Sequence, residues 1–572
     1  MVGCSTRRLA AAAWLSLCLL HAAGGGYVGS KVCAGCHREI YEQYARTPMG
    51  RSLIALPSPL APAAPAQSPR IPGASPDRFY QVESRGGALY QTEILVDAGG
   101  QEVHRQSYQL AYVLGMENGA GYLVKRGDYL CEAPLSYYVR QGAWGLSPGY
   151  ESHDAGFNRP MDAGCIYCHS GRPQAVANRP GLFQPRPFLE EAVGCENCHG
   201  PGQRHAFERG KGTPAAAKPD ALIVNPARLS LALARDLCMT CHQGGDASVL
   251  LPGRSYADLR PGTPSAETFA LFKLPAKPGQ SPEGDVLEHG FSMTFSKCFT
   301  ASGGKLGCLT CHDPHTQPPP ERRAAFYREK CLHCHRDRSC TLPPAERAQR
   351  NRNDCAACHM IRRPLTTFSH SALTNHRIVR RADQPYPESA YRATTAIAPD
   401  LIYVNRPEGR DKPLPAITLF TAYQNLAPRD PRYRERYLSL LLKMLNEGRT
   451  GDPAVATALA AEAQLDGTPE SDAIAVRYWT KALQAGQSTS KAYSDLGGLL
   501  LRAGRAEEAA SVLERCAAAF PLEPDCYRML LEARTSLHQT AQFEETARQY
   551  LELFPEDSDM RKHIEQGRGA LK

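Results

Sequence analysis

The sequence predicts a mainly α-helical protein that carries a small antiparallel β insertion and ends in a solenoid of helical repeats. Three observations lead to this expectation. The pattern Cys-x-x-Cys-His occurs seven times in a glycine- and proline-rich region with little regular periodicity. Alternating apolar and polar residues, split by Gly-Gly pairs, occupy residues 78–150. From about residue 416 onward, alanine, leucine and glutamate recur with the spacing of a helix.

The N-terminus is typical of a secretory leader. Arg7 and Arg8 precede an apolar run, 9–20, which is too short for a resident transmembrane helix and is followed by small residues. We therefore expect residues 1–24 to be a signal peptide, and the protein to be exported to the periplasm or the outer cell surface. An uncleaved anchor is the alternative. No other stretch is long and apolar enough to span a membrane, so we expect no transmembrane segment after cleavage.

The repeated motif has the spacing that attaches c-type haem. Its two thiols add to the two vinyl groups of one haem, and the adjacent histidine binds the iron as proximal ligand. Zinc is the rival, but a zinc site needs four ligands and does not require the trailing histidine. We expect seven covalent haems c, attached through Cys33, Cys36, Cys165, Cys168, Cys195, Cys198, Cys238, Cys241, Cys308, Cys311, Cys331, Cys334, Cys355 and Cys358. The proximal ligands would be His37, His169, His199, His242, His312, His335 and His359.

Net charge gives no support for a nucleic-acid partner. The chain has 66 Lys and Arg against 58 Asp and Glu, a formal charge of +8. Loss of the leader removes Arg7 and Arg8, and each haem adds two propionates, so the mature protein with seven haems would carry about −8. We therefore expect no nucleic-acid binding.

Composition divides the chain after the leader into three parts. Residues 25–380 hold the seven motifs, with the β insertion at about 78–150. Residues 381–415 form a proline-bearing linker, and residues 416–572 form the repeats. We expect the first part to be a cytochrome domain in which the haems themselves supply the core.

The C-terminal part has the period of tetratricopeptide repeats. The spacing from Pro521 to Pro555 equals the length of one such repeat, and the segment from Ala492 to Pro521 matches its helix–turn–helix pattern. An unrelated helical bundle is the alternative. Stacked helical pairs form a concave surface, so we expect this part to dock a protein partner.

Several phrases resemble the multihaem cytochrome superfamily. They are 194–202 (GCENCHGPG), 308–315 (CLTCHDPH) and 370–378, which ends in TNHRI. This superfamily includes pentahaem nitrite reductases, octahaem hydroxylamine oxidoreductases and the tetrahaem cytochromes that accept electrons from the latter. Within it, the chain is most similar to a bacterial group that adds C-terminal tetratricopeptide repeats. The resemblance implies distal histidine ligands at His315 above all, and at His205, His289, His370 and His376; His104 and His153 stay open.

The first haem departs from that pattern. Relatives often carry a distal histidine about a dozen residues after the first motif, whereas here the chain has Met49. Methionine can bind haem iron and raises its reduction potential. We therefore predict Met49 as a ligand of the first haem, with simple packing on the haem edge as the alternative.

The distal ligands decide between a carrier and an enzyme. A haem bound on both faces moves electrons, whereas a haem with an open face can bind substrate. Distal candidates are numerous enough for all seven haems, and every motif ends in His instead of the Lys found in nitrite reductases. We expect a periplasmic or extracellular electron-transfer protein that works with redox partner proteins and has no catalytic residue. The alternative is an oxidoreductase acting on a small nitrogen or sulfur compound at one five-coordinate haem.

Five cysteines lie outside the motifs and the leader. In an oxidising compartment some of them could pair, and Cys298–Cys340 and Cys516–Cys526 are the pairs to test. Buried free thiols are the alternative, for these four and for Cys131.

Overall fold

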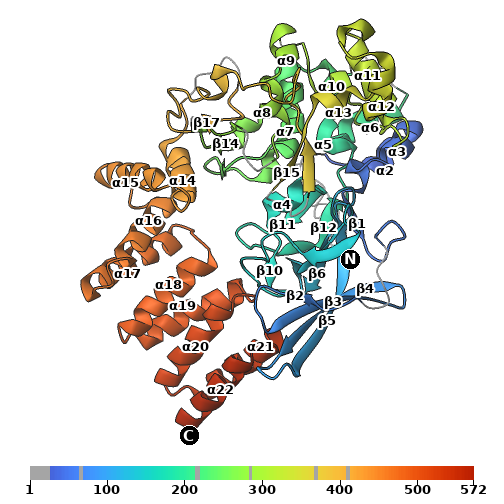
Figure 1. Cartoon of the computed structure of the whole chain (residues 1–572). Coiled ribbons are helices and arrows are strands. Elements are labelled where there is room, and N and C mark those ends of the chain that lie inside the picture. Colours follow the sequence, from blue (N-terminus) through green and yellow to red (C-terminus); the bar gives the residue numbers. More distant parts are fainter. Residues whose placement is uncertain are drawn as a thin grey trace, which may run out of the picture.

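The computed structural model describes residues 26–62, 68–212, 220–277, 279–282, 287–303, 305–365, 371–407 and 413–571. The expected signal peptide and His370 lie outside these residues. In Figure 1 the helices that bear most of the motifs lie at the top, a β sheet lies below them, and a curved row of helices runs down the left side to the C-terminus. Among the described residues, no helix has the length and apolar composition needed to cross a membrane.

The expected β insertion is present and is larger than predicted. It forms an eight-stranded antiparallel sheet of order β10-β7-β6-β5-β4-β3-β2, with β1 added on β5. Gly86 and Gly87, both with positive φ, form the two-residue turn between β3 and β4 that the sequence pattern indicates. The strands are β1 (Leu53–Ala55), β2 (Ile71–Pro72), β3 (Arg78–Arg85), β4 (Ala88–Val96), β5 (Glu102–Leu114), β6 (Gly121–Arg126), β7 (Tyr129–Glu132) and β10 (Arg159–Pro160), with the hairpin β8 (Leu135–Tyr138) and β9 (Ala143–Leu146) beside them.

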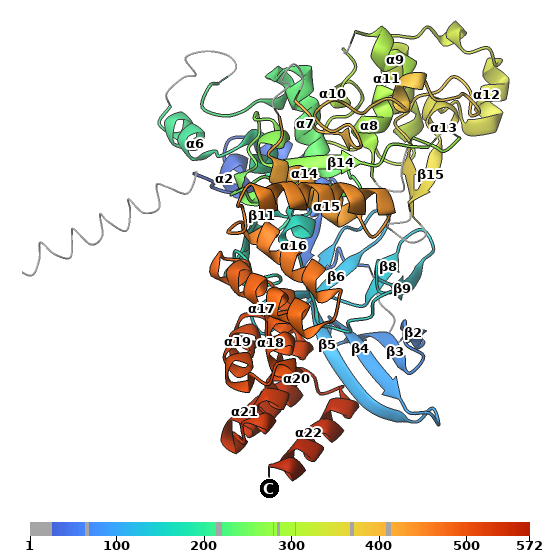
Figure 2. The same ribbon diagram turned by 90° about the vertical axis from the view of Figure 1, so that its left-hand side faces the viewer.

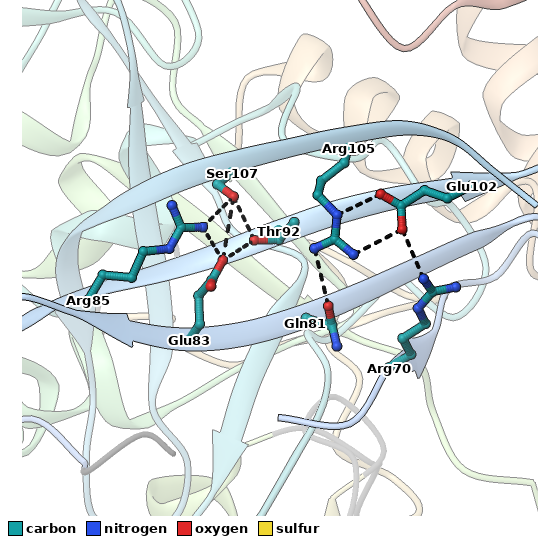
Figure 3. Close-up of polar contacts among 8 residues, drawn as sticks. All are labelled: Arg70, Gln81, Glu83, Arg85, Thr92, Glu102, Arg105 and Ser107. Atoms are coloured by element: carbon teal, nitrogen blue, oxygen red, sulfur yellow. Dashed lines mark hydrogen bonds and ion pairs between the residues drawn. The ribbon is translucent and has the colours of Figure 1, made fainter. Parts of the chain in front are cut away.

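One face of this sheet carries a group of hydrogen-bonded polar side chains, as Figure 3 shows. Arg105 of β5 donates two hydrogen bonds to Glu102, at 2.6 and 2.9 Å, and Arg70 donates to the same carboxylate at 2.9 Å. On β3, Glu83 accepts from Arg85 and, at 2.6 Å, from Thr92 of β4. Thr92 of β4 also lies 2.8 Å from the hydroxyl of Ser107 on β5, so Glu83, Thr92 and Ser107 link three neighbouring strands.

The motif region is built from short helices and small sheets. Its helices are α2 (Ser30–Ala34), α3 (Arg38–Tyr44), α4 (Ala163–Tyr167), α5 (Cys195–His199), α6 (Gln203–Gly210), α7 (Leu231–His242), α8 (His289–Thr294), α9 (Lys297–Ala301), α10 (Cys308–Cys311), α11 (Arg323–Leu332), α12 (Pro344–Asn351) and α13 (Cys355–His359). Antiparallel pairs are formed by β11 (Gly171–Ala175) with β12 (Phe183–Glu190) and by β15 (Arg362–Leu365) with β16 (Ser371–Thr374). The described side chains of α10, α11, α12 and α13 include no buried one.

The predicted linker is partly built into the fold. Its residues 402–403 form β17 (Ile402–Tyr403), which pairs with β14 (Phe269–Lys273), and β14 pairs with β13 (Ala247–Leu250). Phe272 and Tyr403 of this sheet share a core with Phe420 of the first C-terminal helix, α14 (Ala416–Leu426). The segment between the motifs and the repeats is therefore part of a common core.

The C-terminal helices repeat at the expected period. Helices α18 (Ser490–Arg502), α20 (Pro524–Ser536) and α22 (Ser558–Ala570) begin at a constant spacing, which is the length of one tetratricopeptide repeat. Gly497 permits close packing, because a Cβ on it would lie 2.5 Å from Leu513. The other helices of the row are α15 (Pro431–Asn446), α16 (Pro453–Gln464), α17 (Pro469–Gln484), α19 (Ala506–Ala519) and α21 (Thr540–Leu553).

One of the two suggested cysteine pairs is bonded. A disulfide joins Cys516 of α19 to Cys526 of α20, whereas Cys298 and Cys340 are free thiols. Cys131 is a buried free thiol, and burial raises its pKa to about 12.

The helical row is attached to the rest of the molecule at both ends. Its first helix packs on the β13-β14-β17 sheet, as described above. At the other end, Leu522 and Leu553 enter the core of the large sheet. There Arg126 donates to the carbonyl of Leu553 at 2.5 Å, and Asn158 donates to Glu556 at 3.2 Å. Figure 2 shows α20 and α21 below β5, at this second contact.

A buried carboxyl lies on β4 near this second contact. Glu93 is 2 % exposed, and its Oε1 is 3.3 Å from Nε of Arg78. Burial raises the pKa of Glu93 to about 7, against the opposing effect of Arg78, and the charges of Glu556 and Asp154 raise it further. The folded state therefore holds a proton that the unfolded state releases at lower pH.

We predict that this carboxyl makes the protein less stable as pH rises. Because the folded pKa of about 7 exceeds the ordinary value of 4.5, the contribution of Glu93 falls between about pH 4.5 and pH 7, by up to about 3 kcal/mol. Glu93→Gln should remove that loss, measured as the urea midpoint by far-UV circular dichroism at pH 5 and pH 8.

The matched control is Glu83→Gln on the neighbouring strand. Hydrogen bonding to Arg85 lowers the pKa of Glu83 to about 2, so this carboxyl does not titrate between pH 5 and pH 8. The control should keep the pH dependence of the wild type. Equal pH dependence in wild type and Glu93→Gln would contradict the account.

Candidate haem sites

In most motifs a helical turn places the first cysteine and the histidine on one side of the chain. The histidine N–H donates to the carbonyl of the first cysteine at 2.8 Å in the first motif, 3.0 Å in the fifth and 2.9 Å in the sixth. The third, fourth and seventh motifs lie wholly within α5, α7 and α13. This spacing, one turn of helix, is the arrangement in which a haem held by the thiols can also receive the imidazole.

The second motif has a tighter turn. Here the N–H of His169 donates to the carbonyl of Ile166 at 3.1 Å, and not to that of Cys165. The motif begins in α4, whose first turn is capped by Asp162 through the N–H of Gly164 at 2.7 Å. His169 is deeply buried, which lowers its pKa, and its Nδ1 has no hydrogen-bond partner among the described residues.

Thiols of different motifs are in contact. The side chain of Cys33 interacts with Cys195, and this contact lowers the pKa of Cys195 to about 7. In the same way, Cys241 lowers the pKa of Cys168, and Cys238 lowers that of Cys308 to about 7. These contacts join the first motif to the third, the second to the fourth, and the fourth to the fifth.

Further thiols link the remaining motifs. Burial, followed by the charges of Cys355 and Cys311, raises the pKa of Cys331 to about 11, which connects the sixth motif to the seventh and the fifth. Contact with Cys308 and burial raise the pKa of Cys238, and the charge of Cys198 raises it further, so the third motif lies near the fourth. All seven motifs therefore belong to one continuous set of neighbours.

Four proximal histidines each face a second histidine. Two imidazoles bound to opposite sides of one ion, with metal–nitrogen bonds of about 2 Å, have ring centres about 6 Å apart. The four pairs are His37–His205 at 6.3 Å and 15° between ring planes, His199–His315 at 6.0 Å and 21°, His242–His289 at 5.7 Å and 42°, and His312–His376 at 6.1 Å and 35°. Four of the residues expected as distal ligands are therefore placed at the spacing that a shared iron requires.

Hydrogen bonds orient several of these rings. Nδ1 of His199 lies 2.8 Å from the carbonyl of Val224, and Nδ1 of His359 lies 2.8 Å from that of Val379. A ring that donates through Nδ1 presents the lone pair of Nε2, which is the form that binds a metal. Burial also lowers the pKa of His199, and it lowers that of His376 to about 4, so both rings are neutral at pH 7.

His205 has a charged partner that sequence analysis did not identify. Its Nδ1 lies 2.9 Å from Asp220, whose carboxylate also accepts hydrogen bonds from Arg209 at 2.7 and 3.0 Å. These bonds lower the pKa of Asp220, so it stays ionised. A carboxylate on the second nitrogen fixes the ring and makes the ligand more basic. No local sequence pattern indicates this pair, because its two members are fifteen residues apart in the sequence.

The remaining candidates lie elsewhere. Met49 begins a short 3₁₀ turn, Met49–Arg51, and its carbonyl accepts from Ser52, whose hydroxyl also donates to the carbonyl of His169. His104 lies near Glu556, and His153 lies near Glu523, both at the contact with the C-terminal helices. Among the described residues, no second histidine ring stacks with His169, His335 or His359.

Comparisons with known proteins agree with haem attachment. Residues 301–339 match the family model of the doubled CXXCH motif. The C-type polyheme cytochrome OmcB from two strains of Geobacter sulfurreducens, DL-1/KN400 and ATCC 51573/DSM 12127/PCA, is 24% identical over 189 residues, which is 30% of this chain and 22% of the relative. The chain thus covers about a fifth of the length of these relatives.

A solved structure also resembles part of the chain. The complex of the TPR2AB domain of yeast Sti1 with pHSP90 is 19% identical, covering 27% of this chain and 69% of that one, at a TM-score of 0.18. That score is too low to carry an argument about fold. The motif match, the polyhaem relatives and the seven attachment motifs on the described chain together support a multihaem c-type cytochrome.

Proposed function

We propose that the protein is an exported electron carrier whose seven covalent haems c form one row. The observations that carry this proposal are the thiol contacts that join the first motif to the third, the second to the fourth, the fourth to the fifth and the sixth to the seventh. Charge interactions between thiols connect the third motif to the fourth and the fifth to the sixth. Haems attached through neighbouring thiols lie side by side, which is the condition for electrons to pass between them. The order of neighbours is first, third, fourth, fifth, sixth and seventh, with the second haem as a branch on the fourth.

The histidine pairs supply distal ligands for four haems of this row. In this assignment His205, His315, His289 and His376 complete the first, third, fourth and fifth haems. For the first haem we favour His205 over Met49, because His205 already lies opposite His37 and is held by Asp220. His370 stays a candidate for one of the other haems.

The haems would also provide the core of the motif region. The helices from α10 to α13 carry no buried side chain among those described, so protein contacts alone give this part little apolar burial. Haems lying between these short helices would supply the apolar contacts that the protein side chains do not make.

Export and docking complete the proposal. The disulfide Cys516–Cys526 is typical of oxidising compartments such as the periplasm or the cell surface. The helical repeats, which we assign to the tetratricopeptide class from their period, would dock a protein partner on their concave side.

The second motif has features that favour one alternative function. His169 differs from the other proximal histidines in its tighter turn; its Nδ1 is buried without a hydrogen-bond partner among the described residues, and no described histidine stacks with it. A haem with an open face at this branch would reduce or oxidise a small nitrogen or sulfur compound.

Spectroscopy of the oxidised protein separates the carrier from the enzyme. If the protein is an electron carrier, all seven haems should be low-spin by electron paramagnetic resonance, and cyanide should not change the spectrum. Nitrite should then reoxidise the reduced protein no faster than buffer does. One high-spin haem that binds cyanide and is reoxidised by nitrite would favour the enzyme.

A second prediction tests the ligand of the first haem. His205→Ala should leave seven covalent haems, measured by mass spectrometry, but convert one of them to high spin. Asp220→Asn should raise the reduction potential of one haem, because loss of the carboxylate makes the imidazole a weaker donor to ferric iron. Met49→Ala should change neither property.

The matched control for this test is His104→Ala, a histidine at the contact with the repeats. It should leave spin state and potentials unchanged. A high-spin haem in Met49→Ala, together with a methionine–iron charge-transfer band in the wild type, would restore Met49 as the ligand.

A further inference from the structure

The positive charge of the chain is concentrated in one stretch. Residues 320–365 contain eleven Arg and Lys against five Asp and Glu, an excess of six. The whole chain has an excess of eight, of which Arg7 and Arg8 lie in the expected leader. In the rest of the mature chain basic and acidic residues are therefore equal in number, and this stretch carries all the net positive charge of the polypeptide.

Part of this charge is neutralised by carboxylates. Asp337 is shared by two arginines, Glu346 pairs with one arginine, and the buried Glu288 pairs with another. The pairs are Arg328–Asp337, Arg347–Asp337 at 2.9 Å, Arg350–Glu346 at 3.0 Å and Arg363–Glu288 at 3.3 Å.

Four arginines of the stretch remain at the surface. Arg322, Arg336, Arg352 and Arg362 are exposed, and no ion pair is formed by any of them within the part of the chain that the structure describes. An exposed cation without a partner keeps its full field toward solvent.

Three of these arginines flank the last two motifs in the sequence, and the fourth, Arg322, lies at the start of α11, the helix that leads into the sixth motif. Arg336 directly follows His335, Arg352 shortly precedes Cys355, and Arg362 shortly follows His359. In both views α11 and α12 lie at the top of the molecule, at the opposite end from α20, α21 and α22 (Figures 1 and 2). The C-terminal helices therefore leave this surface uncovered.

We propose that this surface, defined by Arg322, Arg336, Arg352 and Arg362, is where a small acidic electron-transfer protein docks to exchange electrons with the sixth and seventh haems. The inference rests on the proposed function, in which these two haems end the row. A cationic rim at the end of a row attracts an acidic partner and holds its cofactor near the haem edge.

Propionate binding is the competing role of these arginines. The two haems bring four propionates, which could pair with some of them. An arginine that holds a propionate affects the potential of that haem, whereas an arginine that only steers a partner does not, so the two roles have separate readouts.

The test uses flavodoxin hydroquinone, an acidic reductant, on the holoprotein in stopped flow. One electron passes from the flavin to a ferric haem, leaving a flavin semiquinone and a ferrous haem. The rate should fall about tenfold as salt rises from low to high concentration. In Arg336→Gln/Arg362→Gln the low-salt rate should fall about tenfold, with most of the salt dependence lost.

The matched control is Arg477→Gln/Arg561→Gln, which removes two exposed arginines of the C-terminal helices α17 and α22, away from α11 and α12 (Figure 1), and should keep the wild-type rate. A basic monohaem cytochrome as redox partner should not be slowed by the Arg336 and Arg362 changes. An unchanged flavodoxin rate in that variant would overturn the proposal, and so would a slower rate accompanied by shifted haem potentials.

A neutral mediator separates failure of this proposal from failure of the proposed function. In every variant it should reduce all seven haems at the wild-type rate. Incomplete reduction of wild-type protein by the mediator would contradict the haem row itself, whatever the arginines do.

Discussion

The helical turn that joins the first cysteine of a motif to its histidine is the constraint on which the structure depends. In the first, fifth and sixth motifs a backbone hydrogen bond of 2.8 to 3.0 Å closes this turn, and three further motifs lie inside helices. Each turn needs little more than the motif itself. Six of the seven motifs form this turn and can be placed side by side, while the large β sheet lies in the connection between the first and second motifs.

Sequence analysis predicted the features that are encoded locally. Each haem motif is a single run of five residues, and the Gly86-Gly87 turn directly joins its two strands. The repeat period is visible in the spacing from Pro521 to Pro555. It could not predict which distal histidine faces which motif. His205 meets His37 from a distant part of the chain, and such a pairing depends on the tertiary fold and not on spacing. Met49 lies where relatives carry a distal histidine, and no sequence pattern shows that His205 lies opposite His37.

The relation of the repeats to the motif region was also not visible in sequence. Residues 381–415 are rich in loop-forming residues, and β17 is only two residues long, too short for any pattern to indicate. Leu522 and Leu553 look like ordinary interior positions of a repeat, yet both enter the core of the large sheet. The C-terminal helices therefore connect the two sheets.

The order of the haems is the central claim, and the positions of the seven irons test it most directly. Anomalous scattering at the iron edge from crystals of the holoprotein would locate them. The account predicts seven irons, with the first nearest the third, the third, fourth, fifth, sixth and seventh in succession, and the second beside the fourth. Irons that fall into separate groups, or a second iron nearest the first, would contradict it.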